Sequence, residues 1–193
     1  MIRSLYDWTL ALAQRPAAPA WLAGVSFVES SVFPIPPDIL LMPMILADRS
    51  AAFRLALICT LASVAGAVSG YAIGALLWQV IGQPIIELYG YTEAFAEFQA
   101  LFAAYGVLTV LVGGLTPFPY KVVTIASGAV AFNLPLFILS SIIARGIRFF
   151  LEAGLLWYFG PPIRAFVEKR LALTVTAFLF LLIAGFFAVK LLA

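Results

Sequence analysis

Long runs without a charged residue dominate the chain. Four of them, residues 55–81, 98–120, 122–144 and 171–189, are each about as long as a helix that crosses a bilayer, which needs roughly 20 consecutive apolar residues. The whole chain has room for about four to six such spans. The pattern therefore predicts an all-α integral membrane protein that crosses the membrane several times.

A further apolar region, residues 17–47, cannot form one continuous helix. It contains Pro34 and Pro36, with Glu29 before them and Asp38 after them. A proline inside a helix removes a backbone hydrogen bond and costs about 3 kcal/mol or more. Broken backbone at membrane depth occurs only where protein or a watery cavity surrounds it. We therefore expect two short helices that form a re-entrant hairpin lining a cavity.

The same device recurs later in the chain. Residues 116–121 can be laid over residues 33–38, so that Pro117 and Pro119 break a second helix and Lys121 takes the position of Asp38. A long apolar stretch follows each break, and both stretches end in Leu-Leu-Trp. This similarity predicts an internal duplication.

The duplication predicts one membrane domain over residues 1–193. Its first repeat is 17–82, its second is 103–160, and a last transmembrane helix covers 171–193. A hairpin returns to its starting side and one helix then crosses, so the second repeat begins on the opposite face and the repeats are inverted. Residues 83–104 have the spacing of an amphipathic helix on the membrane surface. The competing interpretation is that prolines and glycines merely kink ordinary transmembrane helices.

Composition narrows the function classes. Hydrophobic residues make up 64% of the chain and charged residues 10%, against about 25% charged in soluble domains, so no separate soluble domain is expected. Without histidine and with one cysteine, the chain lacks the residues for a Ser-His-Asp triad or a Cys/His zinc site. We expect no metal and no cofactor. The net charge of +2 comes from scattered residues and does not indicate nucleic-acid binding.

Six ionisable residues fall inside apolar segments. Each would cost roughly 2.5–3.5 kcal/mol if it faced lipid, so they are expected to face the protein interior. Arg145, Arg148 and Glu152 follow one another at spacings of three and four and share one helix face. The six are Glu29, Asp38, Lys121, Arg145, Arg148 and Glu152.

These charges suggest a phosphate site coupled to protons. Lys121, Arg145 and Arg148 suit phosphate oxygens, and an incoming phosphate would favour proton uptake by a nearby acid. The proton-coupling candidates are Glu29, Asp38 and Glu152. Glu29 is preferred over Asp38, which could instead cap its helix. The alternative is that the charges are ion pairs that pin helices together, as Arg148 with Glu152 could.

At these residues the sequence resembles the DedA family, and more closely its YqaA-like branch, within the superfamily of SNARE-associated Golgi (VTT-domain) proteins. Glu29 and Asp38 look like the family's membrane acids, and Arg145 and Arg148 like its paired arginines. Lys121 departs from the arginine that many members have there, and lysine cannot grip phosphate bidentately. The matching segments are 27–29, 34–36, 116–121, 124–128 and 145–152.

The resemblance implies a multi-pass protein of the bacterial inner membrane. It would move lipid phosphates, such as undecaprenyl phosphate or phospholipids, between leaflets in a flippase-like or scramblase-like way that is linked to the proton gradient. A homo-oligomer is compatible with the family. An alternative with the same carboxylates is a proton-coupled exporter of a small soluble solute. We do not expect an enzyme, although Glu29 with Asp38, or Ser127 with Lys121, would be the residues to consider.

Charge in the loops predicts the orientation. The inverted path places residues 83–104, which contain no Lys or Arg, opposite the basic residues, and the positive-inside rule puts the basic set in the cytoplasm. That set is Arg3, Arg15, Arg49, Arg54, Arg164, Lys169 and Arg170.

Overall fold

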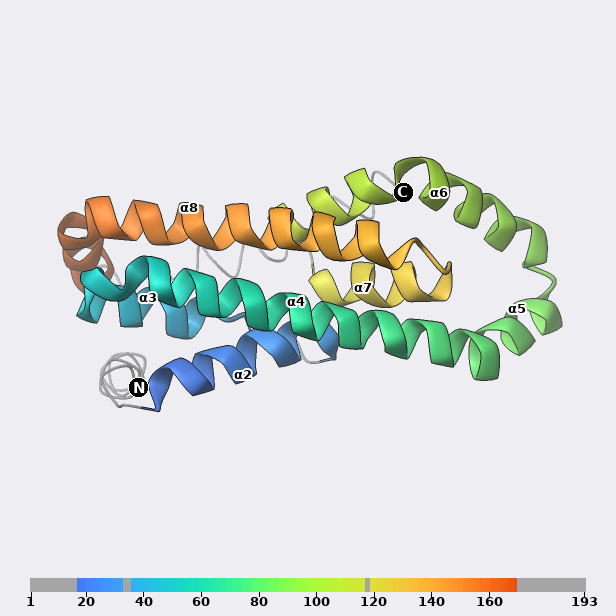
Figure 1. Cartoon of the computed structure of the whole chain (residues 1–193), viewed down its shortest axis with the longest axis horizontal. Helices are drawn as coiled ribbons and strands as arrows, with labels where there is room; N and C mark the ends of the chain where they lie inside the picture. The colour runs from blue at the N-terminus through green and yellow to red at the C-terminus, as the bar shows by residue number, and fades with distance from the viewer. Residues whose placement is uncertain (1–16, 33–35, 117–118, 170–193) are drawn as a thin grey trace.

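The computed structural model describes residues 17–32, 36–116 and 119–169, and within these it consists of helices and turns without a strand (Figure 1). Three helical stretches are long and apolar enough to cross a membrane: Arg49–Tyr89, Phe95–Leu115 and Leu134–Gly160. The helices are α2 (Ala18–Ser31), α3 (Asp38–Ala47), the 3₁₀ turn η1 (Arg49–Ala51), α4 (Ala52–Leu77), the π turn η2 (Trp78–Gly82), α5 (Gln83–Tyr89), α6 (Thr92–Leu115), α7 (Tyr120–Ala129) and α8 (Leu134–Lys169). The predicted all-α membrane class is confirmed at this level.

Helices end at both proline clusters. α2 ends before the first helix break, residues 32–37, and α6 ends before the second helix break, residues 116–119. Pro36 and Pro119 lie in these breaks, whereas Pro34, Pro117 and the last helix expected at 171–193 lie outside the described residues.

One charge-free stretch of spanning length is divided between two helices. Residues 122–144 contain no charge, but α7 ends at Ala129, and Ala131 adopts a left-handed conformation with φ of 53°. α8 then begins, and the Asn133 side chain accepts a hydrogen bond from the Leu136 amide at 3.0 Å. Asn at a helix start followed by a proline in the first turn is a start signal, which Asn133 and Pro135 supply. The charge-free run 122–144 is therefore divided between α7 and α8.

The linker also differs from the expected single surface helix. α5 ends at Gly90, which has a φ of 72°, a conformation that glycine adopts without strain. α6 begins at Thr92 and continues to Leu115. The second half of the linker is therefore continuous with a helix of spanning length.

Two long helices organise the molecule. α4 and α8 pack against each other along the long axis, with α2 against α4 and α6 against α8 (Figure 1). α2 runs from one end toward the middle and α3 returns to that end, while α6 and α7 occupy the other half in the same manner. Buried apolar residues form one cluster among α2, α3, α4 and α8 and another among α4, α6, α7 and α8. Both helix breaks therefore lie near the middle of the bundle.

Glycines let the broken helices approach α4 at backbone distance. A methyl group at Gly66 would overlap the Phe27 carbonyl of α2, and one at Gly74 would overlap the Ile125 carbonyl of α7. Such contacts are the reason that small residues are enriched where membrane helices pack. α4 thus holds α2 and α7 through its glycine face.

This packing predicts that Gly74→Ala lowers the stability of the protein by about 1–3 kcal/mol, the usual cost of overpacking. Gly154→Ala is the matched control, because nothing lies within 4 Å of a Cβ at that position and alanine favours a helix by about 1 kcal/mol over glycine. The readout is thermal unfolding of the purified protein in detergent. Equal stability of the two variants would contradict the close packing.

Candidate functional site

Two arginines of α8 form ion pairs with acids that flank the first helix break. Arg145 Nη2 lies 2.7 Å from Glu29 Oε2, and Arg148 Nη2 lies 2.9 Å from Asp38 Oδ2. Glu29 is near the end of α2 and Asp38 is the first residue of α3. The pairs therefore tie both arms of the first broken helix to the long helix α8.

Arg145 belongs to a closed hydrogen-bond ring. Its Nε donates to Ser63 Oγ at 2.6 Å, Ser63 Oγ lies 2.7 Å from Ser30 Oγ, and Ser30 donates to Glu29 Oε2 at 3.0 Å. Since the single hydroxyl proton of Ser30 is donated to Glu29, we assign the proton between the two serines to Ser63, which donates to Ser30. Glu29 Oε2 then accepts from Ser30 and from Arg145, as an ionised carboxylate does.

The Arg145 guanidinium is also enclosed by aromatic rings. Its central carbon lies 5.0 Å from the centre of the Tyr120 ring and 4.7 Å from that of Phe149, within the range of cation–π attraction. The side chain is 0% exposed. Arg145 is thus fixed by Glu29, Ser63 and two rings, and solvent does not reach it.

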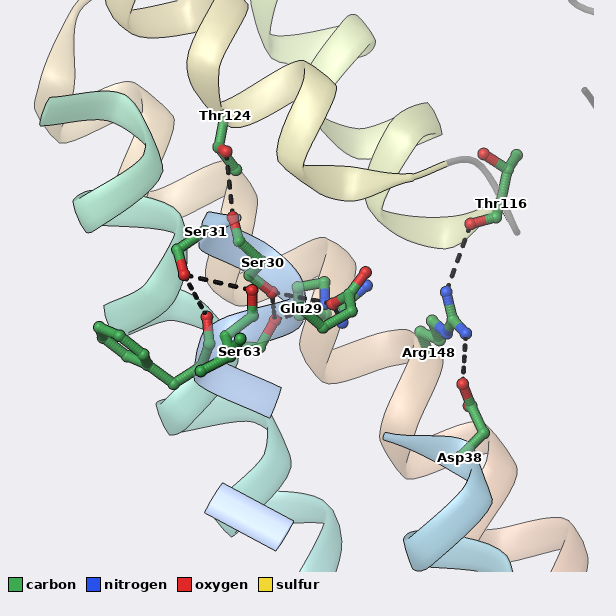
Figure 2. Close-up of polar contacts among 11 residues, drawn as sticks. Glu29, Ser30, Ser31, Asp38, Ser63, Thr116, Thr124 and Arg148 are labelled. Atoms are coloured by element: carbon green, nitrogen blue, oxygen red, sulfur yellow. Dashed lines mark hydrogen bonds and ion pairs between the residues drawn. The ribbon is translucent and has the colours of Figure 1, made fainter. Parts of the chain in front are cut away.

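Arg148 is the more open of the two arginines. Its side chain is 23% exposed, and Nη1 donates to the carbonyl of Thr116, the last residue before the second proline cluster, at 3.4 Å (Figure 2). A guanidinium has five N–H groups, and within the described residues two of them have a hydrogen-bond partner. Arg148 therefore joins both helix breaks and keeps donors for another acceptor.

Lys121 contacts a backbone carbonyl, whereas the two arginines pair with carboxylates. Its Nζ donates to the carbonyl of Val32, the C-cap of α2, at 3.4 Å, where a cation interacts favourably with the helix dipole. The Thr124 hydroxyl reaches the nearby Ser30 carbonyl at 3.1 Å (Figure 2). α7 thus binds the end of α2, and the predicted phosphate set of Lys121, Arg145 and Arg148 is divided between two places.

Glu152 does not form the ion pair that its spacing suggested. Arg148, four residues earlier, pairs with Asp38 instead, and Glu152 lies within interaction range of the Asp38 carboxyl. Among the described residues, the buried Oε1 of Glu152 has no hydrogen-bond partner. Asp38 is the first residue of α3, after the N-cap Pro37, and its side chain is bound by Arg148. The site therefore holds two carboxyls near one arginine.

The residues considered for enzyme chemistry are engaged elsewhere. Glu29 and Asp38 are bound by different arginines. The Ser127 hydroxyl donates to the Val123 carbonyl at 2.7 Å, and Lys121 contacts Val32. In the part of the chain that the structure describes, no cluster of acids or cysteine could hold a metal ion.

Sequence reasoning missed the serines and the tyrosine around Arg145. Ser63 lies one turn before Gly66 on the glycine face of α4, and Tyr120 donates to Ser141 at 2.7 Å. A signal was present, because a hydroxyl on the close-packing face of a membrane helix usually bonds to a neighbouring helix. What it bonds to depends on the tertiary structure.

The chain is similar to a known protein family and to two uncharacterized bacterial proteins. A family model described as the VTT domain matches residues 35–158. An uncharacterized protein of Haemophilus influenzae is 33% identical over 187 residues, which is 97% of each chain. An uncharacterized protein of Histophilus somni is 31% identical over 168 residues, or 87% of each chain. No solved structure matches the chain.

Proposed function

This chain belongs to the VTT-domain, or DedA, family of membrane proteins, and we propose that it moves a lipid with a phosphate headgroup between the two leaflets. Undecaprenyl phosphate and phospholipids both have this chemistry. The observation that carries the proposal is the pairing of Arg148 with Asp38 at the helix breaks, inside an otherwise apolar bundle. Charges are retained in such a setting mainly where they bind or move something charged.

Within this site the headgroup is held by Arg148. Arg145 is wholly buried, and its Nε and Nη2 bond Ser63 and Glu29 while its Nη1 has no partner among the described residues. Arg148 is partly exposed and is therefore the arginine that a ligand can reach. Arginine forks bind phosphate oxygens in pairs. Arg145 then serves to position α8, and Lys121 adds positive charge near the end of α2.

Transport is coupled to protons through the carboxyls at Arg148. Glu29 accepts hydrogen bonds from Arg145 and Ser30 on Oε2 and is the charge partner of a fully buried arginine. Glu152 instead has a buried oxygen without a hydrogen-bond partner among the described residues, next to a second carboxyl. Two neighbouring carboxylates away from water repel each other, and a proton relieves that repulsion. Glu152 with Asp38 is therefore a better candidate than Glu29.

The two halves of the chain form inverted repeats with re-entrant hairpins. α7 packs on α4 as α3 packs on α8, and α2 packs on α4 as α6 packs on α8. Exchanging the halves leaves this pattern unchanged, which supports a two-fold relation in the membrane plane. The hairpins α2–α3 and α6–α7 then enter the inner membrane of a bacterial cell from opposite faces.

The inverted arrangement predicts opposite accessibility of two exposed positions. With Cys59, the only cysteine, replaced by alanine, Glu93→Cys should react with an impermeant maleimide in intact cells and Arg54→Cys should react only after lysis. Basic residues at the start of α4 and the acidic start of α6 lie at opposite ends of the molecule (Figure 1). Labelling of both positions from outside would contradict the inverted repeats.

Headgroup selectivity in liposomes tests the proposed function. The purified protein should accelerate leaflet exchange of a phosphate lipid and leave a galactosyl lipid of the same chain length unchanged. Equal acceleration of both lipids would show that the phosphate is not recognised. Release of a trapped soluble phosphate ester without lipid movement would instead favour the solute exporter.

A further inference from the structure

We propose that Asp38 is an internal substitute for the headgroup phosphate. It occupies Arg148 when no headgroup is bound, and a phosphate monoanion that binds Arg148 displaces it toward Glu152, where the two carboxyls take up one proton. This inference rests on the proposed function, since it assumes that Arg148 binds phosphate. Beyond that function, we propose that Arg148 exchanges Asp38 for the phosphate and that one proton is taken up in the exchange.

The contact between Asp38 and Arg148 is one that a ligand could replace. It uses a single carboxylate oxygen at 2.9 Å, whereas phosphate and guanidinium can form two parallel bonds. Arg148 is 23% exposed at this contact, in contrast to the 0% exposure of Arg145. Asp38 lies in the first turn of α3, directly after the first helix break.

The position to which Asp38 would move already exists. Glu152 is one helical turn beyond Arg148, lies near the Asp38 carboxyl and has an oxygen that lacks a hydrogen-bond partner among the described residues. A carboxylic acid that donates to a carboxylate would satisfy that oxygen. The other charged or titratable groups that act on Glu152 and Asp38 are Arg145 and Arg148 on α8 and Cys59 on α4. Among the described residues, neither arginine has a hydrogen bond to Glu152.

The proton count follows from charge balance. Glu29 balances Arg145, and Asp38 balances Arg148. A phosphate monoanion on Arg148 adds one negative charge to this buried group. Uptake of one proton by Asp38 and Glu152 restores the original charge. No covalent bond forms or breaks in the exchange.

Calorimetric titration of the full-length protein in detergent measures this count. The probe is short-chain phosphatidylglycerol, a diester that lacks the second ionisation of a phosphate monoester near pH 6, and dimethyl phosphate is the soluble counterpart. Titration in two buffers of different ionisation enthalpy gives the protons taken up per probe bound. We expect about one for the wild type, and less than half of that for Glu152→Gln.

Asp38→Asn should remove the carboxylate that competes with phosphate for Arg148. We expect this variant to bind the probe about tenfold more tightly, the factor for 1.4 kcal/mol, and without proton uptake. Asp48→Asn is the matched control, because Asp48 is exposed and two hydrogen bonds from Ser50 lower its pKa, so it stays ionised and should leave binding and proton count unchanged. Binding of dimethyl phosphate as tight as that of the lipid would show that the tails contribute little.

The outcomes separate this inference from the proposed function. Binding by the wild type without proton uptake would overturn the inference and leave phosphate recognition in place. Weaker binding by a folded Asp38→Asn protein would show that Asp38 helps to form the site and does not compete for it. Failure of the wild type to bind either probe would overturn the proposed function as well.

Discussion

Glu29→Gln is expected to destabilise the protein by about 3–5 kcal/mol, the cost of leaving one member of a buried ion pair unpaired. Glutamine has nearly the same shape as glutamate, so the loss of stability measures the effect of removing the charge. Arg145 is 0% exposed, and Glu29 provides the only carboxylate to which it is bonded within the described residues. The readouts are thermal unfolding in detergent and the amount of protein in the membrane.

Two variants accompany this measurement. Glu97→Gln makes the same replacement at an exposed position of α6 and should change stability by less than about 0.5 kcal/mol. Combining Glu29→Gln with Arg145→Gln removes both charges and should recover part of the loss, because no uncompensated ion is left. If Glu29→Gln is as stable as Glu97→Gln, the buried ion pair does not fix α2 to α8.

Arg148→Gln is expected to abolish lipid transport while the protein remains folded. Removing a charged donor from a bound anion typically costs 2–5 kcal/mol, which corresponds to a decrease of roughly 30-fold or more. Stability should change less than in Glu29→Gln, because Arg148 is partly exposed whereas Arg145 is not. Arg148→Lys should retain a fraction of the activity, since lysine keeps the charge and loses the paired hydrogen bonds.

The measurement is leaflet exchange of a phosphate lipid at equal amounts of folded protein. Arg54→Gln is the matched control, because Arg54 is exposed at the start of α4 and lies outside the site. Wild-type rates in a folded Arg148→Gln protein would show that this arginine does not bind the headgroup.

The broken helices and the buried charges could be predicted from sequence because each rests on local chemistry. A cluster of prolines disfavours a continuous helix, so both helix breaks follow from Pro36 and Pro119 and their neighbours, whereas the single Pro43 lies inside α3. An ion in an apolar segment must find a partner, which predicted that Arg145 and Arg148 would face inward. Both arginines do so in the structure.

The choice of partner could not be predicted, because it depends on how helices distant in sequence meet. The spacing of Arg148 and Glu152 favoured an ion pair within α8, but α3 brings Asp38 to Arg148 and leaves Glu152 beside it. Ser63 could not be recognised as part of the site from its neighbours in sequence, because its partner Arg145 lies 82 residues away. The position of the turn at Ala131 could not be predicted, because hydropathy alone does not mark a helix end in an apolar stretch.

Lipid transport by the wild-type protein in liposomes, with and without a pH gradient, tests the central claim most directly. The account predicts that a phosphate lipid changes leaflet faster than in protein-free liposomes, that an imposed gradient increases the initial rate in one direction, and that an ionophore which collapses the gradient removes this increase. A rate equal to that of protein-free liposomes would contradict phosphate-lipid transport. A rate raised by the protein but indifferent to the gradient would contradict proton coupling through Asp38 and Glu152.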